Sequence, residues 1–273
     1  MLSLPFALLD RWCSPAPDPR KVAWIGAQDY AHRGLHGVFE NGGDGGGGGG
    51  VDGGVPENSR AAFAKAIAAG NGIELDVQRS SDGQPIVFHD DTLDRLTAES
   101  GPTDRRSAAQ LGAITLSGTT ETIPTLRQVL AQIGGKVPVL IEIKSDRKVR
   151  IAALCLAVRR VLEGYTGSHA VMSFDPRVSR WYWRHSPHTV RGLIVSEGED
   201  RALPGKIRRH LWLWHARPDF LAYDVRDLPS RFAGAQRRRG LPVATWTVRE
   251  PEHDERAAAH ADAAIFEIRE GDA

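Results

Sequence analysis

The chain has 273 residues, 25% of them charged, and its 35 lysines and arginines nearly balance its 34 aspartates and glutamates. The resulting net charge of +1 gives no reason to expect nucleic acid or an anionic membrane as the main partner. No segment approaches the roughly 18 consecutive apolar residues that a membrane span needs, so stable membrane insertion is not expected.

The first third of the chain contains a helix, a strand and an unusual glycine-rich run. Residues 1–13 are predicted to form a helix that ends at the prolines within 14–20, and we expect it to cover the place of a helix after the last strand. A first strand then ends at residues 30–34. Residues 42–54 contain ten glycines but no following Lys-Ser/Thr, so a flexible loop insertion is favoured over a phosphate-binding loop.

The second strand carries the strongest chemical signal. After a helix over residues 58–69, apolar residues alternate with Glu74 and Asp76, so the two carboxylates share one strand face, roughly 7 Å apart. In a buried interior they would repel each other and therefore require a cation or a shifted pKa. A turn at Asp82-Gly83 reverses the chain, and a second apolar run delivers His89.

The remainder predicts an α/β architecture. Residues 91–124 are polar and contain one short helix near 107–111, which indicates a small insertion after the second strand. Helices are then predicted over 126–133, 151–162, from 176, 206–215, 229–239 and 252–260, and strands over 137–144, 169–174, 189–195, 220–225, 241–248 and 263–266. Eight strands alternating with helices favour a single (β/α)₈ barrel domain over residues 1–273, with an open doubly wound sheet as the alternative.

Three carboxylates are predicted to converge at the carboxyl ends of neighbouring strands, where barrels of this type place their sites. Glu74 and Asp76 end the second strand, and Glu142 ends the third. One alternative is that they form structural ion pairs with Arg33 and Lys144. Three carboxylates against two cations nevertheless fit one divalent cation better, and an all-oxygen ligand set favours Ca²⁺ or Mg²⁺.

Two histidines and two cations complete the predicted site. His32 ends the first strand and His89 follows the turn, so both reach the same face, although each could be an ordinary half-buried histidine. Arg33 and Lys144 provide more positive charge than a metal site needs, which suits a phosphate. The set indicates phosphodiester cleavage, with one imidazole taking a proton from the nucleophile and the other protonating the leaving oxygen.

At these residues the chain resembles the glycerophosphodiester phosphodiesterase family, within the phosphatidylinositol-phospholipase-C-like barrels. The resemblance covers residues 30–267, nearly the whole chain. Its motifs occur in the family's order: His32-Arg33-Gly34, Pro56-Glu57-Asn58-Ser59, Glu74-Leu75-Asp76-Val77, Asp82-Gly83, His89-Asp90, Thr92-Leu93-Asp94-Arg95-Leu96-Thr97, Ile123-Pro124-Thr125-Leu126, Glu142-Ile143-Lys144 and Trp246-Thr247-Val248.

The resemblance implies a barrel enzyme that releases glycerol 3-phosphate and an alcohol from a small glycerophosphodiester. It also implies site roles: Glu74, Asp76 and Glu142 as metal ligands, His32 and His89 as acid–base groups, and Arg33, Lys144, Glu57 and Trp246 on the substrate side. Glu267 matches the family pattern loosely and receives no role.

Three alternatives stay open at this point. A lysophospholipase D would keep the metal site and accept an acyl chain, a non-catalytic barrel would only bind phosphorylated ligands, and a metal-dependent aldolase or lyase would use the same fold.

The aromatic runs 181–183 and 212–214 are expected to pack against the barrel rather than to contact lipid. With only two cysteines, Cys13 and Cys155, a reducing, cytoplasmic location is the simpler hypothesis. The start of the chain lacks the basic region of a signal peptide.

Overall fold

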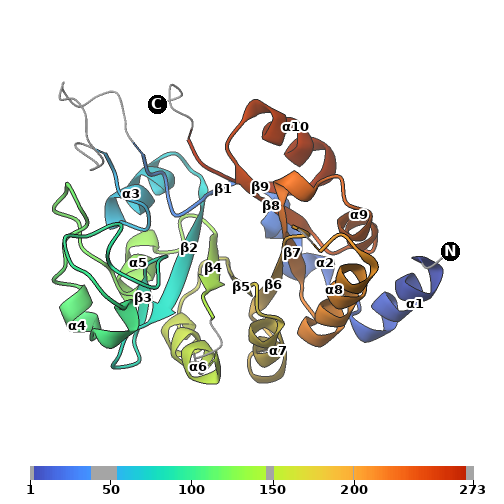
Figure 1. The fold of residues 1–273 in the computed structure, drawn as a ribbon, viewed down its shortest axis with the longest axis horizontal. Helices are drawn as coiled ribbons and strands as arrows, with labels where there is room; N and C mark the ends of the chain where they lie inside the picture. Colours follow the sequence, from blue (N-terminus) through green and yellow to red (C-terminus); the bar gives the residue numbers. More distant parts are fainter. Residues whose placement is uncertain (1–2, 38–53, 146–150, 199, 269–273) are drawn as a thin grey trace. The chain divides into compact units, whose positions relative to one another are not determined.

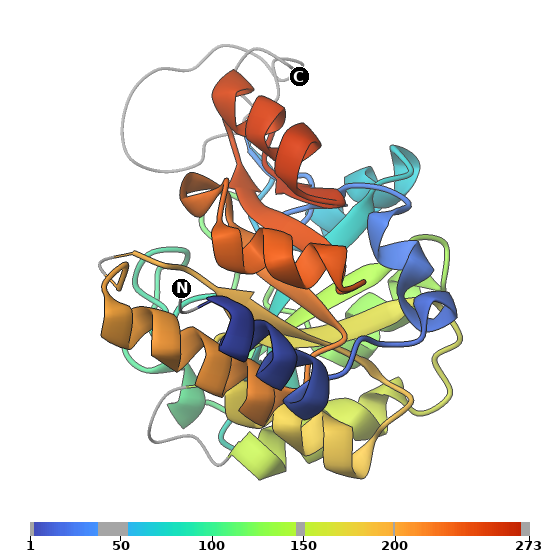
Figure 2. The ribbon, with the colours of Figure 1, turned by 90° about the vertical axis from the view of Figure 1, so that its right-hand side faces the viewer.

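The computed structural model describes residues 3–37, 54–145, 151–198 and 200–268, in which strands and helices alternate (Figure 1, and turned by 90° in Figure 2). The strands are β1 (Tyr30–Ala31), β2 (Gly72–Arg79), β3 (Pro85–Val87), β4 (Val139–Ile143), β5 (His169–Ser173), β6 (Val190–Val195), β7 (Phe220–Asp224), β8 (Val243–Val248) and β9 (Ala263–Phe266). The α-helices are α1 (Ser3–Cys13), α2 (Pro19–Val22), α3 (Arg60–Ala68), α4 (Ala108–Leu111), α5 (Leu126–Ile133), α6 (Ile151–Leu162), α7 (Pro176–His185), α8 (Leu203–Ala216), α9 (Arg231–Arg238) and α10 (Pro251–His260). Short 3-10 helices are η1 (Ala23–Gly26), η2 (Thr103–Arg105) and η3 (Val225–Asp227).

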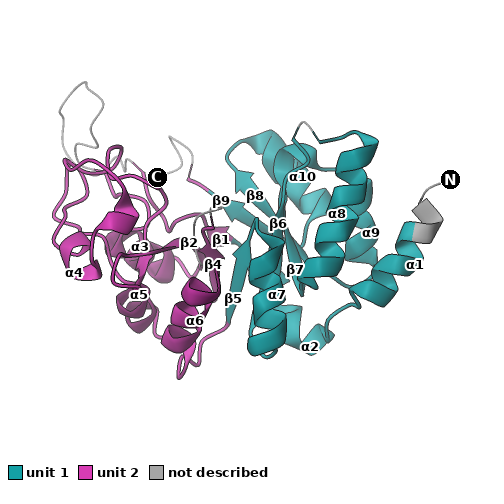
Figure 3. Ribbon diagram, turned by 60° about the horizontal axis from the view of Figure 1, so that its bottom comes forward, with its two compact units in different colours: residues 1–29, 169–266 teal, residues 30–168, 267–273 magenta. Residues whose placement is uncertain are grey.

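The chain divides into two compact units, which Figure 3 shows in different colours. Residues 30–168 with the segment from Glu267 form one unit, called here the β1–β4 unit. Residues 1–29 and 169–266 form the other, called the β5–β9 unit. The expectation of a single domain over residues 1–273 stays a prediction. The glycine-rich run lies, except for Gly54, outside the described residues.

The β1–β4 unit is built around the long strand β2. Its first residues pair in parallel with β1, its last residues pair antiparallel with β3, and its other edge pairs in parallel with β4. The register places Asp76 opposite Glu142. Because the residues of β2 are buried from Gly72 through Gln78, the polar side chains of this strand are enclosed as fully as its apolar ones.

The insertion after β2 and β3 has a small apolar core of its own. Ser107 begins α4 through a capping box with Gln110, as the predicted short helix near 107–111 requires. The buried residues of this core are Ile86, Phe88, Leu93, Leu96, Leu111, Ile114, Leu116 and Ile123. A few short antiparallel bridges, such as Thr97 with Leu116, close the segment on itself. The predicted insertion is therefore confirmed as a structured excursion.

The β5–β9 unit contains five strands that pair in parallel in chain order. Asp175 and Pro176 begin α7 as predicted, because the Asp175 carboxylate accepts a hydrogen bond from the backbone N–H of Arg177. One apolar cluster of this unit comprises Leu193, Val195, Leu213, Ala216, Leu221, Tyr223, Leu228, Phe232, Ala233, Leu241, Val243 and Ala261.

The N-terminal helix packs differently from the expectation that it covers the place after the last strand. Helix α1 packs on α8, where the Phe6 ring stacks on His210 at a centroid distance of 4.4 Å. Asp10, only 1% exposed, accepts hydrogen bonds from Trp214 and Gln236 and contacts His210. Asp10 therefore ties this helix to α8 and α9, because a buried carboxylate needs polar partners and these two helices supply them.

Eight parallel strands, β1, β2 and β4 to β9, alternate with helices, and β3 is an additional antiparallel strand. Strand order follows chain order within each unit, whereas a doubly wound sheet would reverse it at a switch point. The chain has the (β/α)₈ barrel fold, with a small insertion after the second strand.

Candidate active site

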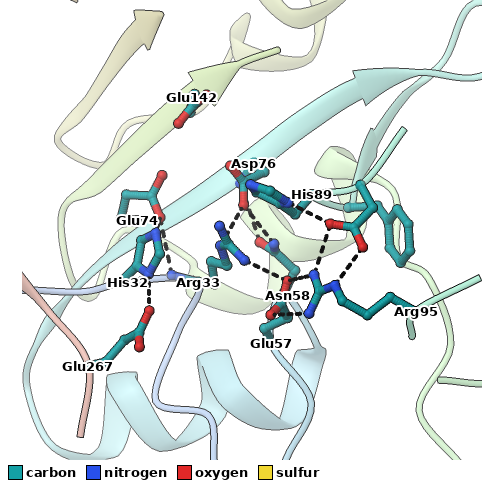
Figure 4. A network of polar contacts seen from close by, with 12 residues as sticks. His32, Arg33, Glu57, Asn58, Glu74, Asp76, His89, Arg95, Glu142 and Glu267 are labelled. Atoms are coloured by element: carbon teal, nitrogen blue, oxygen red, sulfur yellow. Dashed lines mark hydrogen bonds and ion pairs between the residues drawn. The ribbon is translucent and has the colours of Figure 1, made fainter. Parts of the chain in front are cut away.

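A group of three buried carboxylates lies on neighbouring strands of the β1–β4 unit. Glu74 and Asp76 share one face of β2, and Glu142 faces Asp76 from β4. Each of the three side chains offers an oxygen, and these oxygens all lie within 4.8 Å of one another (Figure 4). This is the convergence that the alternation in β2 predicts, and the group could hold a metal ion through oxygen ligands alone.

The electrostatics of the three carboxylates are unequal. Burial, together with the nearby charges of Asp76 and Glu142, raises the pKa of Glu74 well above its usual value. Burial also raises the pKa of Glu142, against the opposing effect of Lys144. Burial acts on Asp76 in the same sense, but Lys144 and Arg33 outweigh it and hold its pKa below the usual range. Three carboxylates share only two nearby cations in this group, and the raised pKa values of Glu74 and Glu142 favour their neutral forms. An additional cation would stabilise their charged forms, which fits a metal ion.

Two basic side chains reach the carboxylates from different strands. Lys144, directly after β4, places Nζ 2.8 Å from Asp76 Oδ1 and 2.7 Å from Glu142 Oε1. Arg33 places Nε 3.2 Å from Asp76 Oδ2, and its backbone N–H donates to Glu74 Oε2 at 3.1 Å. Both predicted cations therefore lie at the predicted carboxylates.

The loop after β1 holds Arg33 in an uncommon backbone conformation. Arg33 has a φ of 55°, in the left-handed region, and Gly34 follows with a φ of 80°. A Cβ on Gly34 would lie 2.8 Å from the Cβ of Ala62 in α3. Glycine is required here because helix and loop approach closely, and that approach directs Arg33 back over β2.

His32 lies beside Glu74 and is held by a residue from the far end of the chain. Its Nδ1 is 2.6 Å from Glu267 Oε1, and its Nε2 is 3.9 Å from Glu74 Oε2 (Figure 4). A carboxylate at Nδ1 favours the tautomer with the proton on that nitrogen. Nε2 is then left as the nitrogen that faces the carboxylates.

His89 lies beside Asp76 and has a comparable partner. Its Nδ1 is 2.6 Å from Asp90 Oδ1, and burial lowers the pKa of the imidazole. Asp90 also accepts two hydrogen bonds from Arg95, and together these contacts lower its pKa to about 2 despite burial. Each imidazole thus presents Nε2 and keeps a carboxylate on Nδ1.

Glu57 links Arg33, in the loop after β1, to Arg95, in the insertion. It accepts a hydrogen bond from Arg33 Nη1 at 2.8 Å and two from Arg95, at 3.0 and 2.7 Å. The two guanidiniums hold the pKa of Glu57 below its usual value, although burial opposes them. Its place at the site agrees with the prediction, and its two partners tie the first strand end to the insertion.

Four contributing residues were not predicted as site residues. Ser59, and not Asn58, caps α3, since its hydroxyl accepts from the backbone N–H of Ala62. Asn58 is instead buried and donates to Asp76 Oδ2 at 2.9 Å. Asp90 and Arg95 orient His89 and Glu57, and Glu267 orients His32. Asn58, Asp90 and Arg95 lie inside the motifs that carry the family resemblance. Those motifs were therefore the sequence signal that could have identified the three as site residues.

Trp246 belongs to the other compact unit. It lies on β8, where its indole N–H donates to the carbonyl of Ala222 at 3.0 Å and its ring packs edge-on against Phe174. Its predicted position beside the substrate stays a prediction.

In the described residues, two further groups of side chains lie close enough together to hold a metal ion. The first is His32, His36 and Glu267, and the second is Glu57, His89 and Asp90. The second is already engaged by Arg95, which binds both Glu57 and Asp90. The first contains two imidazoles and only one carboxylate, and Glu267 already contacts His32. The buried set of Glu74, Asp76 and Glu142 is the one that fits a hard divalent cation.

Buried carboxylates beside an arginine and a lysine, with two imidazoles facing them, define a site for a phosphoryl substrate in a hydrolase. Residues 32–267 match the model of the glycerophosphoryl diester phosphodiesterase family. A glycerophosphodiester phosphodiesterase of Caldanaerobacter subterraneus subsp. tengcongensis is 30% identical over 219 residues, covering 74% of this chain and 84% of the relative. The chain belongs to the glycerophosphoryl diester phosphodiesterase family, and it is therefore a phosphoric diester hydrolase.

Solved structures show the same fold. A phosphodiesterase of Oleispira antarctica, solved in complex with the product sn-glycerol-3-phosphate, superposes with a TM-score of 0.71 at 23% identity, covering 88% of this chain and 92% of that one. The glycerophosphodiester phosphodiesterase of Thermotoga maritima gives a TM-score of 0.63 at 25% identity, covering 77% and 88%. In the described part of this chain, no helix has the length and apolar character needed to cross a membrane.

Proposed function

We propose that this enzyme hydrolyses glycerophosphodiesters to glycerol 3-phosphate and an alcohol. The observation that carries the proposal is the pair of imidazoles, each with Nδ1 on a carboxylate, beside one cluster of carboxylates and cations. The substrate class is supported by the family match over residues 32–267 and by the product bound in the related phosphodiesterase of Oleispira antarctica.

Glu74, Asp76 and Glu142 would hold one divalent cation, Ca²⁺ or Mg²⁺. When bound, such an ion supplies positive charge to phosphate oxygens and favours deprotonation of a nearby hydroxyl. The pKa of Glu74, raised by burial and by its two neighbours, is the feature of this chain that supports the ligand set. Arg33 and Lys144 would bind the phosphate, with the guanidinium able to make two parallel hydrogen bonds.

His32 and His89 would act as an acid–base pair through their Nε2 atoms. One imidazole accepts the proton of the attacking hydroxyl, and the other donates a proton to the leaving oxygen. Glu267 and Asp90 would hold the rings in place. Glu57 would orient Arg33, and Trp246 would provide an apolar wall for the glycerol group. The free thiols Cys13 and Cys155 support a reducing, cytoplasmic location.

Replacing Glu267 by alanine should lower kcat by up to about 10⁴-fold, the effect of removing the carboxylate that orients the catalytic imidazole of a Ser-His-Asp triad. The reason is that His32 would lose the partner on Nδ1 that selects its tautomer. Steady-state kinetics of the variant, with its melting temperature as a check on folding, would measure this effect. Glu252→Ala, an exposed residue paired with Arg256 along α10, is the matched control. An unchanged kcat in Glu267→Ala would contradict the positioning role.

Substrate class is tested with a panel of glycerophosphodiesters and lysophospholipids assayed with Mg²⁺ and with Ca²⁺. We expect the highest kcat/KM for a glycerophosphodiester without an acyl chain, such as glycerophosphocholine. Faster turnover of a lysophospholipid would favour a lysophospholipase D instead, and the same site would then accept an acyl chain. Turnover of neither class with either ion would contradict the proposal.

A further inference from the structure

Most of the exposed large apolar side chains belong to two helices. In the described part of the chain such side chains occur at nine positions, and those outside α1 and α8 are Leu156 and Phe174. The remaining seven are Leu8, Leu9, Trp12, Leu203, Ile207, Leu211 and Trp212. Trp12 is 85% exposed and Leu8 is 66% exposed, far beyond what packing on a neighbouring element leaves. We call these seven residues the α1–α8 surface.

The two helices form one continuous support for this surface. They pack against each other, as Figure 2 shows, through the Phe6–His210 stack and the hydrogen bond from Trp214 to Asp10. Leu203, Ile207 and Leu211 recur every four residues, so they form one stripe along α8. On its inner side, α8 packs into the core through the buried Leu213 and Ala216. The outer stripe is not part of that core cluster.

The exposed charges on the two helices themselves have one sign. Asp10 is the single acidic residue of α1, and it is buried, while α8 contains no acidic residue. Exposed cations on the same helices are Arg11, Lys206 and Arg208. The Arg208 guanidinium lies 5.3 Å from the centre of the Trp212 ring and pairs with Asp200 in the preceding loop. The α1–α8 surface is therefore apolar and cationic together.

A cavity of about 680 Å³ opens beside these helices within the same unit. Phe6, Leu203 and Phe232 contribute apolar walls, and Lys206 and Arg231 contribute positive charge. The carboxylates that line it, Asp10, Glu197 and Asp227, are already paired with His210, Arg209 and Arg201. An anionic headgroup could enter this cavity while apolar groups contact the stripe.

We propose that the α1–α8 surface docks on an anionic lipid bilayer, with both helices lying in the plane of the interface. Apolar and tryptophan side chains on one face, flanked by lysine and arginine, are the features of helices that bind at such interfaces. Neither helix spans the bilayer, since 14 and 11 residues are too few. A second copy of the chain is a poorer occupant, because its own cations would face Arg11, Lys206 and Arg208. The proposal concerns only the β5–β9 unit and stands independently of the catalytic assignments.

Co-sedimentation of the full chain with vesicles tests the proposal. Binding should be strong to vesicles of phosphatidylcholine with phosphatidylglycerol, weak to phosphatidylcholine alone, and reduced when salt rises from about 0.1 M to about 1 M. Lys206→Gln should weaken binding about fivefold, the effect of one cation near an anionic surface. Trp12→Ser, Ile207→Ser and Leu211→Ser should each weaken it about tenfold, because apolar contact with the bilayer is lost.

The matched control is Leu156→Ser. Leu156, on α6 in the other unit, is 36% exposed, close to the 38% of Ile207, and its replacement should leave vesicle binding unchanged. Melting temperature and hydrolysis of a soluble diester report whether each variant is folded. Equal binding to neutral and anionic vesicles, or equal loss in Leu156→Ser and Ile207→Ser, would overturn the proposal. Dimers in sedimentation velocity that Ile207→Ser dissociates, without lipid binding, would assign the surface to a second copy instead.

Discussion

Alanine in place of His89 should lower kcat by roughly 10²- to 10⁴-fold, the range that a general acid or base contributes. The side chain is 31% exposed, so its truncation leaves little buried void and should cost little stability. His32→Ala should show a loss of similar size, since each imidazole is expected to transfer a different proton of the same reaction. Steady-state kinetics on a glycerophosphodiester would measure both losses.

The matched control is His188→Ala, an exposed histidine of the β5–β9 unit that should keep full activity. The double variant His32→Ala/His89→Ala should lose little more than the worse single variant, because groups that act as a unit are not additive. Near-full activity in either single variant, in a protein with unchanged melting temperature, would refute the acid–base pair.

Chelation of divalent ions should abolish turnover, and addition of Mg²⁺ or Ca²⁺ should restore it. The physical reason is that Glu74, Asp76 and Glu142 bring three carboxylate oxygens within 4.8 Å of one another, and their charged forms need a cation besides Lys144 and Arg33. Binding to the folded chain alone should also raise the melting temperature, since an ion at 100 times its Kd stabilises by about 2.7 kcal/mol. Activity assays and thermal unfolding, each with and without chelator, measure the two effects.

Glu142→Gln should remove the metal-dependent rise in melting temperature, because an amide offers the ion no charge. Glu99→Gln, in the insertion and paired with Arg106, is the matched control and should keep that rise. An enzyme that works at full rate in excess chelator would show that the three carboxylates serve another purpose, such as fixing Lys144 and Arg33.

Local patterns in the sequence predicted the elements that carry the site. Alternation placed Glu74 and Asp76 on one face of β2, and the same reading placed Glu142 on its neighbour. Both cations and both histidines lie where strand ends were predicted, because the fold brings the carboxyl ends of parallel strands together.

Two contacts of the site were not predicted. Glu267 meets His32 across 235 positions, and neither residue carries a local signal of the other. Asn58 and Ser59 were both possible caps of the helix predicted over residues 58–69. Ser59 takes that role, and the hydrogen bond from Asn58 to buried Asp76 was not predicted. Capping preferences depend on the residues next to a helix start, so they can be read from local sequence. The hydrogen-bond partners of a buried carboxylate depend on which polar groups the fold brings to it, and these are not visible in local sequence.

The overall composition did not predict the positive charge of the α1–α8 surface. The net charge of +1 suggested no anionic partner. That value sums the whole chain, however, whereas α1 has a single acidic residue and α8 has none. The aromatic runs show the same mixture: Tyr182 and Leu213 are buried as expected for packing, while Trp212 is exposed.

The insertion's separate core has a consequence for the active site. His89 and Asp90 lie between Phe88 and Leu93, and Arg95 precedes Leu96, so three site residues are spaced among side chains of that small cluster. Cooperative units within a protein open with their own free energies, often well below that of global unfolding. If residues 86–123 open as such a unit, we expect this local equilibrium to set the fraction of molecules with a correctly placed His89, so that heat inactivates the enzyme before it melts the sheet.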